Sequence, residues 1–158
     1  MYKATKELIE QRQHFCTSQI KIAEVTNLGG GQVNDCYGNA WRLKNKNRNY
    51  FIVSGWFILP FNEVHKNVHV IQHWFNIDMR KKQYVDTSPV EKNAEYVVDM
   101  NLYEFCLKNN ENLTTHVATS LIYEDDRFKT VREFNAYQQI VTEIDMLTTE
   151  NLYHHCLK

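Results

Sequence analysis

The spacing of apolar and polar residues predicts a helical start followed by a strand and a second helix. Residues 4–14 have the period of an amphipathic helix, and residues 19–25 alternate between apolar and polar positions as a half-buried strand does. Residues 36–44 again have a helical pattern. Asn34 or Asp35 is the expected cap of that helix, because both side chains can accept hydrogen bonds from its first N–H groups.

The middle of the chain is rich in the β-branched and aromatic residues that favour strands. Residues 49–59 form one such segment, in which Gly55 predicts a bulge. Residues 68–78 and 83–87 form two more, separated by a basic stretch at 80–82. We expect these two segments to pair as a hairpin around the basic stretch.

The last third of the chain favours helices. The expected elements are helices over 97–108, 129–144 and 146–157, with one strand over 115–124. The order of all these elements predicts an α+β fold in which N-terminal helices pack on an antiparallel sheet. No change of composition marks a boundary, so we expect one domain over 1–158 with a helical C-terminal part at 90–158.

Charge and hydropathy restrict the partners of the chain. The net charge is −1 over 158 residues, so nothing in it calls for nucleic acid or an anionic membrane. The longest apolar run, at 51–61, is shorter than the roughly 20 residues that a membrane-spanning helix needs. The first residues are charged and amphipathic, unlike a secretory signal. We therefore expect a cytoplasmic protein.

Cys36 is distinguished from the other cysteines by its position. It follows the glycine run at 29–31 and opens a predicted helix, where the helix dipole favours a thiolate. Its backbone N–H, with the side chain of Gln32 or Asn34, is a candidate oxyanion hole. Asp35 opposes the thiolate by its negative charge. The remaining cysteines are scattered and are expected to be free thiols: Cys16, Cys106 and Cys156.

His73 and Asp86 are candidates for the base that a thiol nucleophile needs and for the acid that orients it. They are thirteen residues apart, and a hairpin closed by a two-residue turn at Met79-Arg80 would place them opposite each other. The same register would pair Phe75 with Tyr84 and Trp74 with Val85. Asp86 would then bind one ring nitrogen of His73 while the other faces Cys36.

These segments resemble, in the same order, the motifs of transglutaminase-like proteins. Residues 36–40, Cys-Tyr-Gly-Asn-Ala, are similar to the Cys-x-x-x-Ala helix start of that family. Residues 52–56, Ile-Val-Ser-Gly-Trp, resemble its strand ending in Val-x-Gly-Tyr or Trp. His73-Trp74 resembles its His-Ala-Trp without the Ala, and residues 84–89, Tyr-Val-Asp-Thr-Ser-Pro, resemble its Asp-Pro-Thr strand.

The resemblance covers residues 29–89 and implies a papain-like cysteine enzyme. Cys36 would be the nucleophile, His73 the base and Asp86 the orienting acid. Such an enzyme would be a hydrolase or acyltransferase that attacks an amide or acyl carbon of a peptide, protein or small substrate and needs neither a metal nor another cofactor. Trp56 and Trp74, which lie within the motifs, would help to bind the substrate.

Other interpretations of the same residues remain open. Asp35 departs from the small or apolar residue common in the family, which is compatible with a binding protein that keeps the scaffold with an idle triad. His65, His69 and His73 stand at four-residue steps and, on a helix, would share one face and bind zinc with Glu63. On a strand each step would span about 13 Å, too far for one metal ion. The aromatic residues would equally well form a core.

Overall fold

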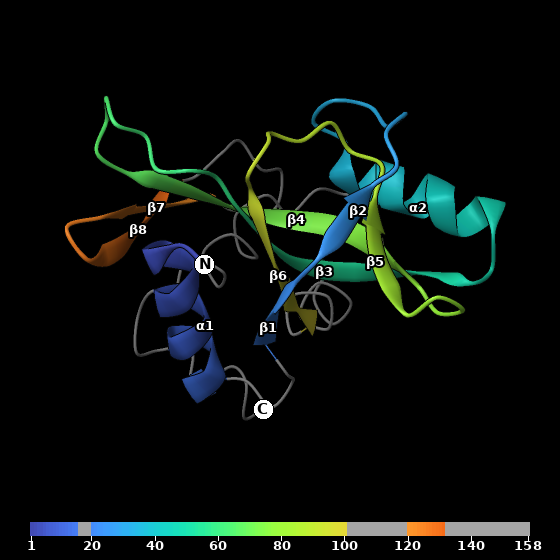
Figure 1. The fold of residues 1–158 in the computed structure, drawn as a ribbon, viewed down its shortest axis with the longest axis horizontal. Coiled ribbons are helices and arrows are strands. Elements are labelled where there is room, and N and C mark those ends of the chain that lie inside the picture. Colours follow the sequence, from blue (N-terminus) through green and yellow to red (C-terminus); the bar gives the residue numbers. More distant parts are fainter. Residues whose placement is uncertain (16–19, 101–119, 132–158) are drawn as a thin grey trace.

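The computed structural model describes residues 1–15, 20–100 and 120–131 (Figure 1). This part of the chain is an α+β structure with two helices and a curled, mainly antiparallel sheet that forms a half-barrel. The helices are α1 (Lys3–Phe15) and α2 (Cys36–Lys46). The strands are β1 (Ile20–Ala23), β2 (Val25–Asn27), β3 (Tyr50–Ile58), β4 (Val68–Asp78), β5 (Gln83–Asp86), β6 (Glu95–Asp99), β7 (Ser120–Glu124) and β8 (Arg127–Val131).

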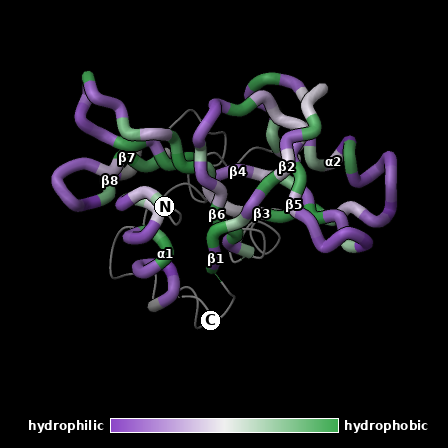
Figure 2. Tube along the Cα trace, in the orientation of Figure 1, coloured by the Kyte–Doolittle hydropathy of each residue, from purple (hydrophilic) through white to green (hydrophobic). Residues whose placement is uncertain are grey.

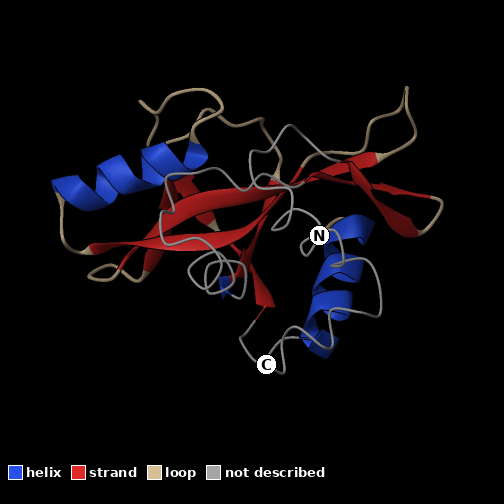
Figure 3. Cartoon of the chain, turned by 180° about the vertical axis from the view of Figure 1, so that it is seen from behind, coloured by secondary structure: helices blue, strands red, loops and turns tan. Residues whose placement is uncertain are grey.

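The strand order explains why the sheet is curled. The main path runs β1-β6-β3-β4-β5-β2, and the β7–β8 hairpin adds to β4 outside this path. Strands β1 and β2 lie at opposite ends of the path, yet only Glu24 separates them in the chain. The two ends of the sheet must therefore approach each other. Figure 1 shows β1 and β2 as one nearly continuous ribbon in front of the other strands, and Figure 3 shows the sheet from behind.

The curl gives the sheet two apolar faces. One side of β3, with Ile52 and Trp56, packs against both helices in the larger core. The other side, with Val53 and Phe57, faces the inside of the curl and forms a smaller aromatic core with Phe75 and other residues of β4 and β6. Because successive side chains of a strand point to opposite faces, β3 and β4 are buried at most positions, although β4 also carries polar residues. Figure 2 shows hydrophobic colour along β3, a mixture of colours along β4, and mainly hydrophilic colour in the turns.

Several elements are confirmed. Helix α1 matches the prediction over 4–14, α2 begins at Cys36 as expected, and β4 has the predicted bounds of 68–78. The predicted strand over 19–25 is divided into β1 and β2. None of the helices within 1–15, 20–100 and 120–131 is long and apolar enough to cross a membrane.

The bulge expected at Gly55 is wrong. The pairing of β3 with β4 is regular through this residue, which lies opposite His73. A Cβ at Gly55 would lie 1.9 Å from the carbonyl oxygen of Val97 on β6. The glycine is therefore needed for the close approach of a neighbouring backbone and not for an extra residue in the strand.

The helical prediction for the C-terminal part is wrong at 97–99 and 129–131, whereas Met100 is helical as predicted. Residues 97–99 belong to β6, and residues 129–131 belong to β8. Strand β6 pairs with β1 on one edge and β3 on the other, and successive residues from Tyr96 to Asp99 are buried, so it has no alternating pattern to reveal it. The expected strand over 115–124 is confirmed for 120–124. The remaining predicted helical positions lie outside the described residues.

Candidate active site

Cys36 is the first residue of α2 and is partly exposed. Asp35 stands at the cap position, but its side chain makes no capping hydrogen bond. Its carboxylate instead accepts a hydrogen bond from Arg42 Nη2, two helical turns further on, at 2.8 Å. The expected side-chain cap is therefore wrong, and the negative charge beside Cys36 is balanced by a guanidinium.

His73 lies in the middle of β4, at a gap in the strand pairing. On one edge β4 pairs with β3 along its length. On the other edge, β7 pairs with residues 68–71 and β5 with residues 76–78, so none of the described strands pairs with 72–75. Helix α2 packs against this stretch, where the ring of Tyr37 meets that of Trp74 edge-on at 5.3 Å. The gap gives the start of α2 access to His73.

The three predicted catalytic side chains come together at this point. His73 Nε2 is 2.7 Å from Asp86 Oδ2, and the Cys36 thiol lies close enough to the same imidazole to help raise its pKa. Because Asp86 occupies Nε2, the nitrogen left for Cys36 is Nδ1. His73 is 8% exposed and Asp86 1% exposed, whereas Cys36 reaches the surface. A buried acid, a buried base and a partly exposed thiol thus lie together.

Burial and hydrogen bonding change the ionisation of both buried members. Burial alone would lower the pKa of His73, but the hydrogen bonds and charges of Asp86 and Cys36 outweigh it and raise the pKa to about 9. Burial alone would raise the pKa of Asp86. Hydrogen bonds from His73, Ser88 and Tyr96, with the charge of His73, hold it below its usual value. The pair is therefore an ion pair at neutral pH, with a positive imidazolium beside the thiol.

The hairpin that brings His73 to Asp86 has a different register from the predicted one. The observed pairs include Asn76 with Val85 and Asp78 with Gln83, and the turn between the strands has four residues. The pairs expected opposite each other, including His73 with Asp86 and Trp74 with Val85, are therefore wrong by two positions. A shift of two keeps every side chain on its face, so His73 and Asp86 meet as diagonal neighbours.

Asp78 explains the longer turn. Its Oδ1 accepts hydrogen bonds from the backbone N–H of Arg80 at 2.9 Å and of Lys81 at 3.3 Å. Lys82 then closes the turn with a φ of 53°. An aspartate that binds the N–H groups two and three residues later is a common start of a turn.

The predicted oxyanion-hole side chains, those of Gln32 and Asn34, both lie at the surface of the loop before Cys36. What the structure fixes is the backbone of Gln32. Its N–H donates to Asn39 Oδ1 and its carbonyl accepts from Asn39 Nδ2, both at 2.8 Å. Asn39 is buried in α2, and its Nδ2 also donates to Ser88 Oγ at 3.1 Å. The loop is thereby joined to the segment that carries Asp86.

Trp56 and Trp74 do not present a surface to a ligand. Trp56 is 0% exposed, and its indole Nε1 donates to Asp99 Oδ2 at 3.0 Å. Trp74 is 3% exposed and packs on Tyr37. Both indoles belong to the core between the sheet and the helices, which is the alternative that the aromatic pattern left open.

Three residues that the sequence did not single out complete the site. Tyr96 donates its hydroxyl to Asp86 Oδ2 at 2.8 Å, and the backbone N–H of Ser88 donates to Asp86 Oδ1 at 2.8 Å. Asn39 ties the preceding loop to Ser88. A serine two residues after a buried aspartate is a weak turn signal. Nothing in the local pattern of Tyr96 or Asn39 indicates contacts with residues that far away in the chain.

The zinc alternative loses its helical basis. His69 and His73 lie on strand β4, four residues apart, and His65 lies in the exposed turn before it. Glu63, the fourth proposed ligand, pairs with Lys66. No group of three potential ligands comes together in the part of the chain that the structure describes. The histidines and cysteine at 153–156 lie outside that part.

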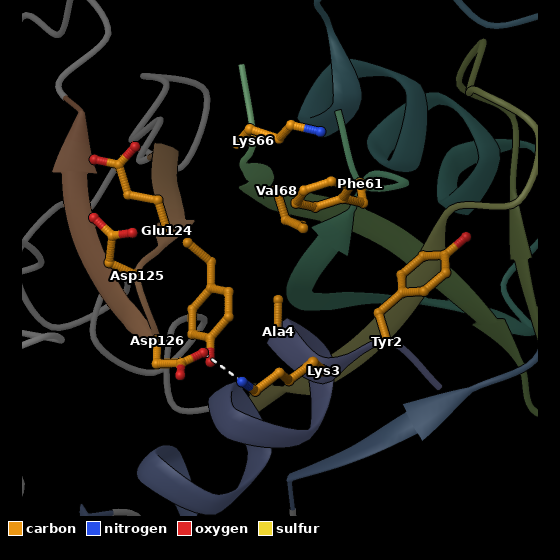
Figure 4. A pocket seen from close by; sticks show the side chains of 10 residues that line it. Tyr2, Lys3, Ala4, Phe61, Lys66, Val68, Glu124, Asp125 and Asp126 are labelled. Atoms are coloured by element: carbon orange, nitrogen blue, oxygen red, sulfur yellow. Dashed lines mark hydrogen bonds and ion pairs between the residues drawn. The ribbon is translucent and has the colours of Figure 1, made fainter. Parts of the chain in front are cut away.

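A separate pocket lies between the start of α1 and the β7–β8 hairpin (Figure 4). Ala4, Phe61 and Val68 are among the apolar residues that line it. At its rim Lys3 pairs with Asp126. None of its lining residues belongs to the Cys36–His73–Asp86 site, so the pocket does not bear on the chemistry of that site.

Comparisons with models of known families, with curated proteins and with solved structures find no match to this chain. The functional argument therefore rests on the geometry of the site.

Proposed function

We propose that this protein is a cysteine hydrolase or acyltransferase with a transglutaminase-like (papain-like) fold. One observation carries the proposal: a buried imidazole is hydrogen-bonded to a buried carboxylate and interacts with the partly exposed Cys36 thiol at a helix start. A nucleophile, its base and the group that orients the base are the three parts of a covalent catalytic triad. The helix with Cys36 and the sheet with His73 and Asp86 agree with the resemblance in the sequence.

The reaction begins with the Cys36–His73 pair. The imidazole of His73 holds the proton of the thiol, so that Sγ attacks the carbonyl carbon of an amide or ester. The carbonyl oxygen becomes an oxyanion, for which the backbone N–H of Cys36 is a free helical donor. The intermediate collapses to a thioester on Cys36, and His73 gives its proton to the departing amine or alcohol. Asp86 stabilises the imidazolium throughout.

The second half of the reaction decides the class of enzyme. If water attacks the thioester, with His73 as base, the product is a carboxylic acid and the enzyme is a protease, deamidase or amidase. If an amine attacks, the product is a new amide and the enzyme is a transferase. Both routes return the thiol and use the same three side chains.

The proposal is tested by trapping the acyl-enzyme. p-Nitrophenyl acetate should release one burst equivalent of p-nitrophenolate, and intact-mass and peptide analysis should place the acetyl group on Cys36. Adding glycine ethyl ester should then increase the turnover if the enzyme is a transferase. The Cys36→Ala variant is the control and should show no burst. A wild-type protein that is folded but acquires no acetyl group on Cys36 would contradict the proposal.

A binding protein with an idle triad is the second candidate, and Asp35 is the observation in its favour. Its carboxylate is the immediate neighbour of Cys36, where it opposes a thiolate. The ion pair with Arg42 weakens that effect. The Arg42→Ala variant separates the two candidates: in an enzyme it should slow acylation of Cys36, whereas in an idle site it should change nothing.

A further inference from the structure

We propose that Tyr96 is a positioning residue of this site, which holds Asp86 in its ionised form and fixes the oxygen that binds His73. The inference rests on the proposed function and adds a residue from outside the resembling segment. Tyr96 lies on β6, and two strands, β3 and β4, separate β6 from β5 in the sheet. Its hydroxyl can reach Asp86, at the end of β5, only across the inside of the curl.

Tyr96 supplies one of three donors that fix the carboxylate of Asp86. Oδ1 accepts from the backbone N–H of Ser88, while Oδ2 accepts from both Tyr96 and His73. By itself, the hydrogen bond from Ser88 fixes only Oδ1 of the Asp86 carboxylate. The hydroxyl of Tyr96 holds the second oxygen in place from a different strand, so that it points at Nε2 of His73.

The ring of Tyr96 also shields this hydrogen bond. It meets the imidazole of His73 edge-on at 5.8 Å and the rings of Phe57 and Phe75 at 5.1 and 5.4 Å. Tyr96 itself is 7% exposed. A wall of three aromatic rings keeps water from the bond between Asp86 and His73, and a hydrogen bond to a charged group is stronger where water is excluded.

Tyr96 remains a donor at neutral pH and well into the alkaline range. Burial and the charge of Asp86 both raise the pKa of the phenol above its usual value. The hydroxyl in turn helps to lower the pKa of Asp86. The other titratable groups near Tyr96 and Asp86 are His73 on β4 and Cys36 on α2. Tyr84 of β5 packs on Phe75, and Lys21 lies over the ring of Tyr84.

The test compares Tyr96→Phe with Tyr84→Phe. Both variants remove one hydroxyl from the same aromatic cluster, but only Tyr96 donates to Asp86. The pKa of His73 is followed by the NMR shifts of its ring, and the rate of Cys36 alkylation by iodoacetamide is measured from pH 4 to 9. Tyr96→Phe should lower the pKa of His73 and reduce alkylation at pH 5 about tenfold, the effect of one hydrogen bond to a charged group. Tyr84→Phe should change neither quantity.

A double-mutant cycle shows whether Tyr96 acts through Asp86. In an Asp86→Asn background, adding Tyr96→Phe should have no further effect on either quantity. An unchanged His73 titration in Tyr96→Phe, or an equal effect with and without Asp86, would overturn the inference. The NMR titration needs no reactive cysteine. If the proposed function failed and Cys36 were inert, the titration would therefore still decide the role of Tyr96.

Discussion

The two faces of the sheet each bury an aspartate that is bound to a cation and to an aromatic donor. On the helix side, Asp99 accepts from Arg12 Nε at 2.6 Å and from Trp56 Nε1 at 3.0 Å. Inside the curl, Asp86 accepts from His73 at 2.7 Å and from Tyr96 at 2.8 Å. By burial and hydrogen bonding alone, the two groups are nearly equivalent.

What separates them is the nature of the cation and what lies beyond it. Arg12 is a guanidinium, which keeps its charge at every accessible pH, and it is 2% exposed. His73, with a pKa raised to about 9, can still give and take a proton within the accessible pH range, and it lies beside a thiol that reaches the surface. The Asp99 group joins α1 to the sheet, whereas the Asp86 group has the parts of a reaction. Buried ion pairs therefore indicate function only where the cation can titrate and meets an accessible reactive group.

The largest change in the rate of Cys36 acetylation should follow from changing His73. His73→Gln keeps a donor for Asp86 but removes the base, so acetylation of Cys36 should fall by about 10²- to 10⁴-fold. His69→Ala, four residues earlier on the same strand, is the control and should acetylate at the wild-type rate. Stopped-flow release of p-nitrophenolate measures both rates. If the acetylation rate fell equally in the two variants, His73 would not be distinguished from His69 as the base.

Asp99→Asn should affect stability and leave the chemistry intact. It leaves Arg12 as a buried charge without its carboxylate, which costs roughly 3 to 5 kcal/mol in the free energy of unfolding. Urea denaturation measures this loss. Below the transition, the rate of Cys36 alkylation should equal that of the wild type. A large fall in that rate would show that the two buried groups are not independent.

Asp86→Asn should have its main effect on the chemistry. Turnover should fall by about a hundredfold or more, because the imidazolium loses the carboxylate that orients and stabilises it. Asp78→Asn is the matched control, since Asp78 is also buried on the hairpin but binds the N–H groups of its turn. It should disturb the turn and leave turnover near the wild-type value. The reverse result would mean that Asp78 is the acid that serves His73.

The smallest effect is the pH dependence of stability. The pKa of His73 is raised to about 9, so the ion pair stabilises the fold fully below the unfolded value near 6.5 and loses this contribution as the pH rises towards 9. The pKa of Asp86 is lowered, so its contribution is lost only as the pH falls below the usual range of aspartate. Unfolding free energies from pH 5 to 9 should decline in the wild type and be nearly flat in His73→Gln.

The sequence was informative where one local pattern determines the element. Helix α2 has a helical pattern, from which the position of Cys36 at a helix start follows, and strand β4 is rich in the β-branched and aromatic residues that favour strands. Strand β6 was missed because it is buried between two neighbours and its run of valines has no alternation. The β7–β8 turn uses Asp125 and Asp126, both with positive φ. Aspartate tolerates this conformation, but its presence in a sequence does not predict it.

The candidate triad could be predicted in spite of the wrong register because its geometry depends on the face of the strand. A two-residue turn and the observed four-residue turn both put His73 and Asp86 on the same side. The contacts of Tyr96 and Asn39 could not be predicted, because they depend on how the sheet curls and where α2 lies. Gly55 shows the same limit: the close approach of Val97, which requires the glycine, comes from a strand that the pattern did not reveal.

The most direct test of the account is the rate of iodoacetamide alkylation at Cys36 as a function of pH, in the wild type and in His73→Gln, with peptide analysis to resolve all four cysteines. At pH 6, Cys36 should react at least about tenfold faster in the wild type than in the variant, because an imidazolium beside a thiol favours the thiolate. In the wild type it should also react faster than Cys16, Cys106 and Cys156. If Cys36 reacts at the same rate in both proteins across this range, His73 does not activate it and the proposed site is wrong.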